Sequence, residues 1–172
     1  MSRAAKYYIG MVVLGGLVSL AYGAMRLPQP DKIWVLALLV VLCGLAQAAP
    51  VPLFSNSSVS VAFAMSFISL LLFGPAGAIL ANLGSAAVHA LYPKRRPWYK
   101  IIFNTGVFTI SAALAGATYV ELQGPWPVRD LTSAAIPLGA AALVYFLVNT
   151  GMISLVVSLT TGADFRKVFN EN

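Results

Sequence analysis

The sequence predicts an all-α membrane protein, a polytopic bundle of six transmembrane helices with both termini in the cytoplasm. Hydrophobic residues make up 59% of its 172 residues and charged residues only 9%, whereas soluble domains carry about 25% charged residues. The hydrophobic residues fall in long runs, and about 20 apolar residues in a helix cross the hydrocarbon layer. Basic residues gather between these runs, and short loops rich in lysine and arginine mark the cytoplasmic side.

Six apolar runs are long enough, or nearly long enough, to span the membrane. The predicted spans are residues 7–25, 32–49, 58–73, 75–92, 100–121 and 132–161. The third run is short and ends at Gly74-Pro75, so spans three and four are expected to form a tight helical hairpin. The sixth run is long enough to tilt, or to kink near Pro137. Residues 1–161 form the predicted transmembrane domain, and residues 162–172 form a cytoplasmic connector.

Basic residues are distributed unequally between the two sides that these spans define. One side holds the loop at residues 93–100 and has Arg3, Lys6, Lys94, Arg95, Arg96, Lys100, Arg166 and Lys167. The other side has Arg26, Lys32 and Arg129. The first side is therefore predicted to be cytoplasmic. The net charge of +6 lies beside apolar spans, which favours membrane lipids as partners and argues against nucleic acid.

The loop at residues 49–58, Ala-Pro-Val-Pro-Leu-Phe-Ser-Asn-Ser-Ser, carries no charge. A charge-free loop can dip back into the bilayer where its backbone lines a protein cavity. A plain turn followed by a serine-rich N-cap for the third span fits the same composition. The sequence leaves both alternatives open.

Neutral polar residues inside the spans are the candidates for a ligand-binding site. They are Asn82, Ser85, His89, Asn104, Tyr145 and Asn149. The first three share one helix face, because residues three and four positions apart are neighbours on a helix. An amide facing lipid is unfavourable, so these side chains should point at one another or at a ligand. Hydrogen bonds between helices and a polar floor for a ligand pocket are both consistent with this pattern.

The sequence lacks the residue patterns of several other kinds of site. No Asp, Glu, Lys or Arg lies deep within a span, which argues against a proton relay, a charged channel or an intramembrane carboxylate enzyme. His89 is the only histidine, and no metal-ligand spacing is present, so neither a metal nor another cofactor is expected. The chain alone is therefore not expected to be an enzyme. Cys43 is interpreted as a buried structural thiol.

Small residues recur along the first span. Gly15, Ser19 and Gly23 lie at a spacing of four residues, which lets helix backbones approach closely. Packing inside the bundle and a contact in a dimer or with a partner both fit this pattern.

The connector is predicted to form a short helix after the last span. Gly162 can end that span or let it bend, and Asp164 is placed to cap a helix that begins at Phe165. The side chains of Phe165, Val168 and Phe169 would give this helix an apolar face for a partner or the lipid surface. The segment is interpreted either as a transmitter to a cytoplasmic domain or as a simple junction.

Several short stretches form a pattern that is similar to a known family. They are Val51-Pro52-Leu53, Ser58-Val59-Ser60, Leu70-Leu71-Leu72-Phe73-Gly74-Pro75, Arg96-Pro97-Trp98-Tyr99, Phe103-Asn104, Ala115-Gly116 with Tyr119, Val148-Asn149-Thr150 and Asp164-Phe165-Arg166-Lys167-Val168. Together they cover nearly the whole chain. They resemble the N-terminal multi-span sensor module fused to bacterial cyclic-di-GMP signalling enzymes, which carry HD-type phosphodiesterase or GGDEF cyclase domains.

This resemblance implies a multi-pass sensory domain of the bacterial inner membrane. Such a domain would bind a small apolar or amphipathic ligand, or respond to the bilayer, and regulate an enzyme that follows Asn172, as a homodimer. The proline-rich loop and Leu-Phe-Gly-Pro also resemble substrate-binding S components of energy-coupling-factor vitamin transporters. Matching those helices would place residues 94–100 outside, against the charge distribution. A passive membrane anchor is a third alternative.

Overall fold

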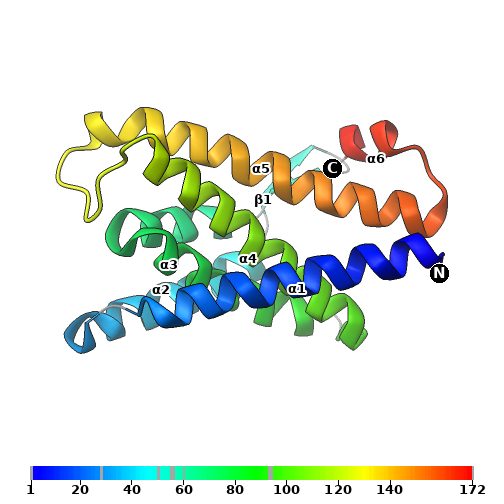
Figure 1. The fold of residues 1–172 in the computed structure, drawn as a ribbon, viewed down its shortest axis with the longest axis horizontal. Helices are drawn as coiled ribbons and strands as arrows, with labels where there is room; N and C mark the ends of the chain where they lie inside the picture. The colour runs from blue at the N-terminus through cyan, green and yellow to red at the C-terminus, as the bar shows by residue number, and fades with distance from the viewer. Residues whose placement is uncertain are drawn as a thin grey trace.

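The computed structural model describes residues 2–27, 29–49, 51–54, 57–59, 61–92 and 95–171. In chain order the elements are α1 Arg3–Met25, η1 Pro30–Lys32, α2 Ile33–Ala48, β1 Val51–Phe54, β2 Ser57–Val59, α3 Ala62–Leu91, α4 Trp98–Glu121, α5 Leu131–Thr161 and α6 Phe165–Glu171 (Figure 1). The predicted all-α class is confirmed, with the short β1–β2 pair as an unpredicted addition. The bounds of α1, α2, α4 and α5 agree with the predicted first, second, fifth and sixth spans to within four residues.

The centre of the bundle is formed by α3 and α4. Helix α4 contacts α1, α3 and α5, and α2 packs along α3; Figure 1 shows α4 crossing between α1 and α5. Leu70 and Ile79 of α3 and Tyr119 of α4 are fully buried in this core. In contrast, α1 and α5 carry large apolar side chains on their outer surfaces, such as Leu14 and Ile136. Helices that are apolar all round suit a lipid environment.

Helix α3 reverses direction at Gly74, as the predicted hairpin requires. Gly74 has φ 70° and ψ −165°, which favours glycine, and a proline follows it. Nδ2 of Asn82 donates a hydrogen bond of 2.7 Å to Oγ of Ser66. In a straight helix these two residues would lie about 24 Å apart. The segments of α3 before and after Gly74 are therefore two antiparallel helices packed side by side.

The residues before α3 form a two-stranded antiparallel hairpin. Strand β1 pairs with β2, and Val51 lies opposite Val59. Helix α3 then begins at Ala62, with Val61 as its N-cap and no side-chain cap bond. The expected start of the third span at residue 58 is thus wrong, and the alternative of a serine-rich N-cap is not what the structure shows, because pairing with β1 takes up the backbone of β2 instead. Residues 50, 55, 56 and 60 lie outside the described residues.

The beginning of α1 and the end of α5 lie at the same end of the bundle (Figure 1). Oγ of Ser2 donates to the Leu159 carbonyl at 3.1 Å, and the Tyr8 hydroxyl donates to the Met152 carbonyl at 3.2 Å. Helix α4 also begins here, since the rings of Tyr8 and Phe103 are 6.1 Å apart. We call this the basic end; the described basic residues at the start of α1, around the start of α4 and in α6 are Arg3, Lys6, Arg95, Arg96, Lys100, Arg166 and Lys167. The opposite end has Arg26, Lys32 and Arg129.

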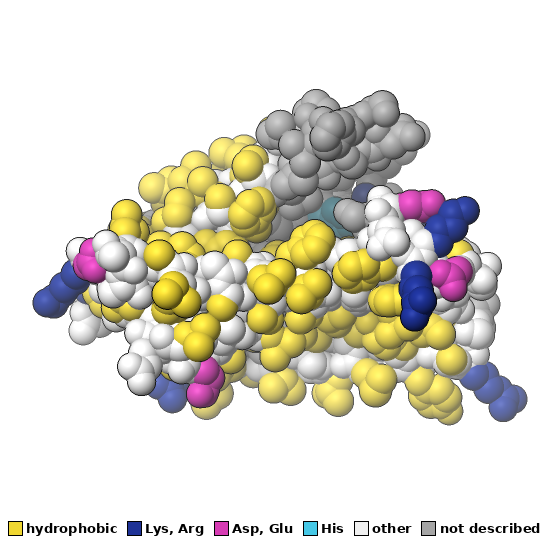
Figure 2. All heavy atoms as spheres, turned by 90° about the horizontal axis from the view of Figure 1, so that it is seen from above, with side chains coloured by type: hydrophobic (Ala, Val, Ile, Leu, Met, Phe, Trp, Pro, Cys, Tyr) yellow, Lys and Arg dark blue, Asp and Glu magenta, His cyan; other side chains and the backbone are white. Residues whose placement is uncertain are grey.

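Four helices of the described chain, α1, α3, α4 and α5, are long and apolar enough to cross a membrane. Helix α2 is apolar but has only 16 residues. The six predicted spans therefore become four candidates by length and composition, because the two segments of α3 are taken as one helix and α2 is too short. Each of those segments is shorter than the about 20 residues of a full crossing. Figure 2 shows charged side chains gathered towards the two ends and hydrophobic side chains along the face between them.

Glycine allows α1 to pack closely against α4. A Cβ on Gly16 would lie 2.5 Å from Cα of Gly106, so no larger residue fits at this crossing without a backbone shift. Within the predicted small-residue pattern, Gly15 faces α4 and Gly23 faces α3. These contacts support packing inside the bundle. The closest approach, at Gly16, lies one residue away from that pattern.

Helix α5 begins and ends at residues suited to each position. The carboxylate of Asp130 accepts hydrogen bonds from the backbone amides of Thr132 and Ser133, which hold the pKa of this carboxyl below its usual range. At the other end, Gly162 has φ 76° and terminates the helix in the left-handed conformation. Gly162 therefore ends the span, one of the two outcomes expected for it.

The predicted connector helix is present as α6, and it folds back along α5. The amide of Lys167 donates to Oδ1 of Asp164 at 3.0 Å, which confirms the predicted cap. Val168 is buried, and Cε2 of Phe169 lies 4.0 Å from where a Cβ on Gly151 of α5 would be. The apolar face of α6 thus packs on α5 of the same chain, whereas the sequence suggested a partner or the lipid surface.

Candidate functional site

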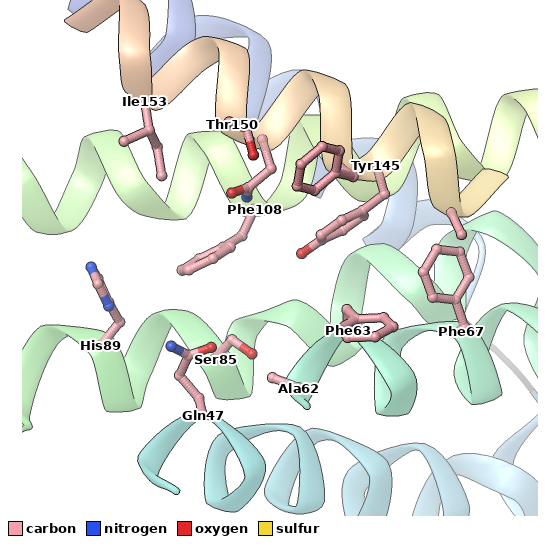
Figure 3. Close-up of a pocket in the computed structure, with 13 residues that line it drawn as sticks. Gln47, Ala62, Phe63, Phe67, Ser85, His89, Phe108, Tyr145, Thr150 and Ile153 are labelled. Carbon is pink, nitrogen blue, oxygen red and sulfur yellow. The ribbon is translucent and has the colours of Figure 1, made fainter. Parts of the chain in front are cut away.

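A cavity of about 480 Å³ lies between the end of α2, both segments of α3, and helices α4 and α5 (Figure 3). Cavities that hold small molecules measure about 300–1,000 Å³. The lining residues are Gln47, Ala62, Phe63, Phe67, Ser85, His89, Phe108, Ala142, Tyr145, Phe146, Asn149, Thr150 and Ile153. The cavity is therefore large enough for a small organic ligand.

Aromatic side chains form much of the apolar wall. The rings of Phe67 and Tyr145 pack edge to face, with centroids 5.9 Å apart, and Phe63 packs on Phe67 at 6.2 Å. His89 and Phe108 form a second T-shaped pair at 5.7 Å. In Figure 3, His89 lies towards one end and Phe67 towards the other, with Phe108 and Tyr145 directed into the space between them. Such walls offer apolar and edge contacts to a flat or hydrophobic ligand.

A buried hydrogen-bond network supports the Tyr145 side of the cavity. Nδ2 of Asn82 donates to Ser66 Oγ at 2.7 Å and to the Ala78 carbonyl at 2.9 Å. The Tyr145 hydroxyl donates to Oδ1 of Asn82 at 3.0 Å. Because Asn82 is 1% exposed, these bonds satisfy an amide that would otherwise be unpaired in an apolar interior. The network fixes α5 to both segments of α3.

The thiol of Cys43 in α2 contacts Ser85 behind the cavity wall. Sγ of Cys43 lies 3.1 Å from Oγ of Ser85 and donates to the Ala62 carbonyl at 3.4 Å. Cys43 is fully buried, as its interpretation as a structural thiol requires. The thiol therefore links α2 to both segments of α3, and it positions two lining residues.

An amide of the α5 wall has no partner in the described structure. Nδ2 of Asn149 is buried and makes no hydrogen bond with the described residues. An unpaired buried donor costs about 1–3 kcal/mol. The next residue, Thr150, is 7% exposed and also lines the cavity. The side-chain amide of Asn149 is thus the group in this wall that can still donate a hydrogen bond.

The cavity lining carries no formal charge apart from the ionisable ring of His89. None of its described lining residues is Asp, Glu, Lys or Arg. The described residues also include no group of three or more His, Cys, Asp or Glu side chains that could hold a metal ion. An ionised ligand would lose its hydration here, and no described lining residue other than His89 could offer it a charge. The lining therefore suits a neutral molecule with few polar groups.

Four of the six predicted site residues line this one cavity: Ser85, His89, Tyr145 and Asn149. Asn82 lies behind the wall and holds Tyr145, so its contacts match the hydrogen-bonding interpretation. Asn104 is half-buried in α4 and does not line the cavity.

Sequence reasoning missed the phenylalanines of the lining. Phe63 and Phe67 are four residues apart and so share a helix face. Phe108 and Phe146 come from α4 and α5. In a chain that is 59% hydrophobic, phenylalanine gives no contrast with its neighbours. The spacing of Phe63 and Phe67 was the one available signal.

The fold and the cavity together define a class, a helical membrane protein with an uncharged, ligand-sized site between its helices. The chain belongs to the MASE9 family, whose family model matches residues 36–172. The MASE families are membrane-associated sensor domains of signalling proteins. No curated protein and no solved structure matches the chain.

Proposed function

We propose that this chain is the sensory domain of a cyclic-di-GMP signalling protein, and that a neutral apolar or amphipathic small molecule binds in its cavity. Binding regulates a cytoplasmic enzyme joined to the C-terminal end of the domain. The observation that carries the proposal is the uncharged, aromatic-walled cavity along α5. Membership of a sensor family supports the signalling role. The likeness to modules of HD-type and GGDEF proteins supports the choice of enzyme.

Helix α5 is the proposed route from the cavity to the enzyme. Six of its residues between Ala142 and Ile153 line the cavity, and Gly151 in the same stretch faces Phe169 of α6. A ligand that displaces this part of α5 changes the surface on which α6 rests. A ligand shifts the equilibrium between two states of a protein only if it binds them with different affinities. In this proposal the two states are α6 docked on α5 and α6 released from it.

The basic end is proposed to lie in the cytoplasm of a bacterial inner membrane. Among the described basic residues, seven lie at this end and three at the other, and short basic loops stay inside. We take α1, α2, the two segments of α3, α4 and α5 as six passes. An even number of passes returns both termini to one side, in agreement with the contact between Ser2 and Leu159. The enzyme-bearing protein is proposed to act as a homodimer.

The proposal is tested by filling the cavity in the enzyme-bearing protein. Ala142 lines the cavity, whereas Ala135 of the same helix is exposed and does not line it. Ala142→Phe is expected to occupy the ligand's space and to shift cyclic-di-GMP turnover in isolated membranes by about 5–150-fold, the range of allosteric coupling. Ala135→Phe should leave turnover unchanged. Equal turnover in the wild type and both variants, at equal expression, would support a passive anchor instead.

A further inference from the structure

A second hollow of about 500 Å³ lies on the outer surface, between α1 and α4 near the basic end. Helix α1 contributes Lys6, Ile9, Gly10 and Val13. Helix α4 contributes Trp98, Tyr99 and Ile102. It shares no lining residue with the cavity of the proposed function.

The lining of this groove changes from polar to apolar along its length. Both helices begin at the basic end, so the groove starts beside Lys6 and Trp98. Val13 lies seven residues further along α1, which corresponds to about 10 Å towards the middle of the bundle. Ile102 lies one turn further along α4. A positive charge and aromatic rings therefore stand at one end, and aliphatic side chains continue from it.

The aromatic residues at this end are exposed, as they are at a membrane interface. Trp98 is 72% exposed and Tyr99 40%, with their rings edge to face at 6.2 Å. Tryptophan and tyrosine prefer the headgroup layer, where the ring meets lipid and its polar group meets water. Arg3 precedes Lys6 by three residues, which places the two cations on one side of α1. Among the described residues that line the groove there is no Asp or Glu.

We propose that this groove binds one anionic phospholipid. Its phosphate is held at Lys6, with Arg3 nearby, and one acyl chain lies along Gly10, Val13 and Ile102. Charge complementarity selects an anionic headgroup over a zwitterionic one, since each lysine at a membrane surface attracts acidic lipid. The absence of a side chain at Gly10 leaves room for the acyl chain, because a Cβ there would meet nothing within 4 Å.

The test is native mass spectrometry of the 172-residue chain in detergent, titrated separately with dioleoyl phosphatidylglycerol and dioleoyl phosphatidylcholine. The wild type is expected to bind one phosphatidylglycerol at concentrations where phosphatidylcholine does not bind. Lys6→Gln, a change at an exposed side chain, should reduce the preference for phosphatidylglycerol about fivefold. Gly10→Leu should lose the bound lipid, because the new side chain fills the groove.

Gly139→Leu is the matched control, since a Cβ on Gly139 of α5 would also meet nothing within 4 Å. It should bind phosphatidylglycerol like the wild type, and Lys6→Gln carries the test if Gly10→Leu fails to fold. Equal binding of the two lipids by the wild type would overturn the proposal, as would wild-type selectivity in Lys6→Gln. A wild-type dimer that dissociates in Gly10→Leu would assign the groove to a second copy of the chain and also overturn it.

Discussion

Tyr145 of α5 donates a hydrogen bond of 3.0 Å to Oδ1 of Asn82 in α3, across 63 residues of sequence. Tyr145 lines the cavity, whereas Asn82 is buried behind it and is also bonded to Ser66. This hydrogen bond therefore connects the cavity-lining side of α5 to the helical hairpin of α3. Its removal is expected to affect both stability and ligand binding.

Tyr145→Phe keeps the ring packed on Phe67 and removes only the hydroxyl. Oδ1 of Asn82 then loses its donor, and an unsatisfied buried acceptor costs about 1–3 kcal/mol. We expect the free energy of unfolding of the detergent-solubilised chain to fall by that amount, measured by denaturant titration. Phe146→Leu, an apolar change at a neighbouring lining residue, is the comparison. An unchanged unfolding midpoint in Tyr145→Phe would mean that the hydrogen bond contributes nothing to stability.

Gly16→Ala is expected to destabilise the bundle, because its Cβ would lie 2.5 Å from Cα of Gly106. Overpacking of this kind typically costs about 1–3 kcal/mol. Gly10→Ala is the matched substitution on the same helix, and it has free space. Thermal unfolding should therefore separate the two variants, with only Gly16→Ala falling below the wild type. If both unfold alike, α1 does not pack against α4 at this glycine.

The proposed orientation is testable with cysteine labelling on intact cells. Cys43 is fully buried and provides a silent background. Arg129→Cys, at the end opposite the basic end, should react with an impermeant maleimide, and Arg95→Cys should react only after the membrane is permeabilised. Both positions are exposed in the structure. Labelling of residue 95 alone on intact cells would place the basic end outside.

Val168→Asp is expected to release α6 from α5, since Val168 is the buried side chain of this short helix. Burial of a valine side chain stabilises by about 1.5 kcal/mol or more, equivalent to at least about tenfold in the docking equilibrium. A free seven-residue helix is not stable in water. Amide hydrogen exchange in residues 165–171 should therefore accelerate by at least about tenfold. Exposed Asn170→Asp serves as the control, and unchanged exchange in Val168→Asp would show that α6 does not depend on this contact.

The hairpin of α3 could be predicted because Gly74 and Pro75 are strong local signals. Both act through the backbone, so they are visible in sequence without knowledge of the neighbours. The β1–β2 pair could not be predicted in the same way. Its register depends on backbone pairing between two short strands, and the serines nearby also fit a helix cap.

The polar part of the candidate site could be predicted better than the rest. Ser85, His89, Tyr145 and Asn149 stand out in apolar spans because a polar side chain there needs a partner. Asn104 is also a polar residue in an apolar span, but it does not line the cavity. Tertiary packing decides which face of a helix is turned towards the cavity, and the sequence does not show it. The docking of α6 was also beyond sequence reasoning, since an apolar face does not reveal what covers it.

The proposed binding of a neutral small molecule in the cavity can be observed by native mass spectrometry of the purified chain. The wild type and Ala135→Phe are predicted to retain one neutral, non-phospholipid molecule per chain, and Ala142→Phe to lose it. Identical spectra for all three proteins, with phospholipid as the only bound species, would contradict the claim.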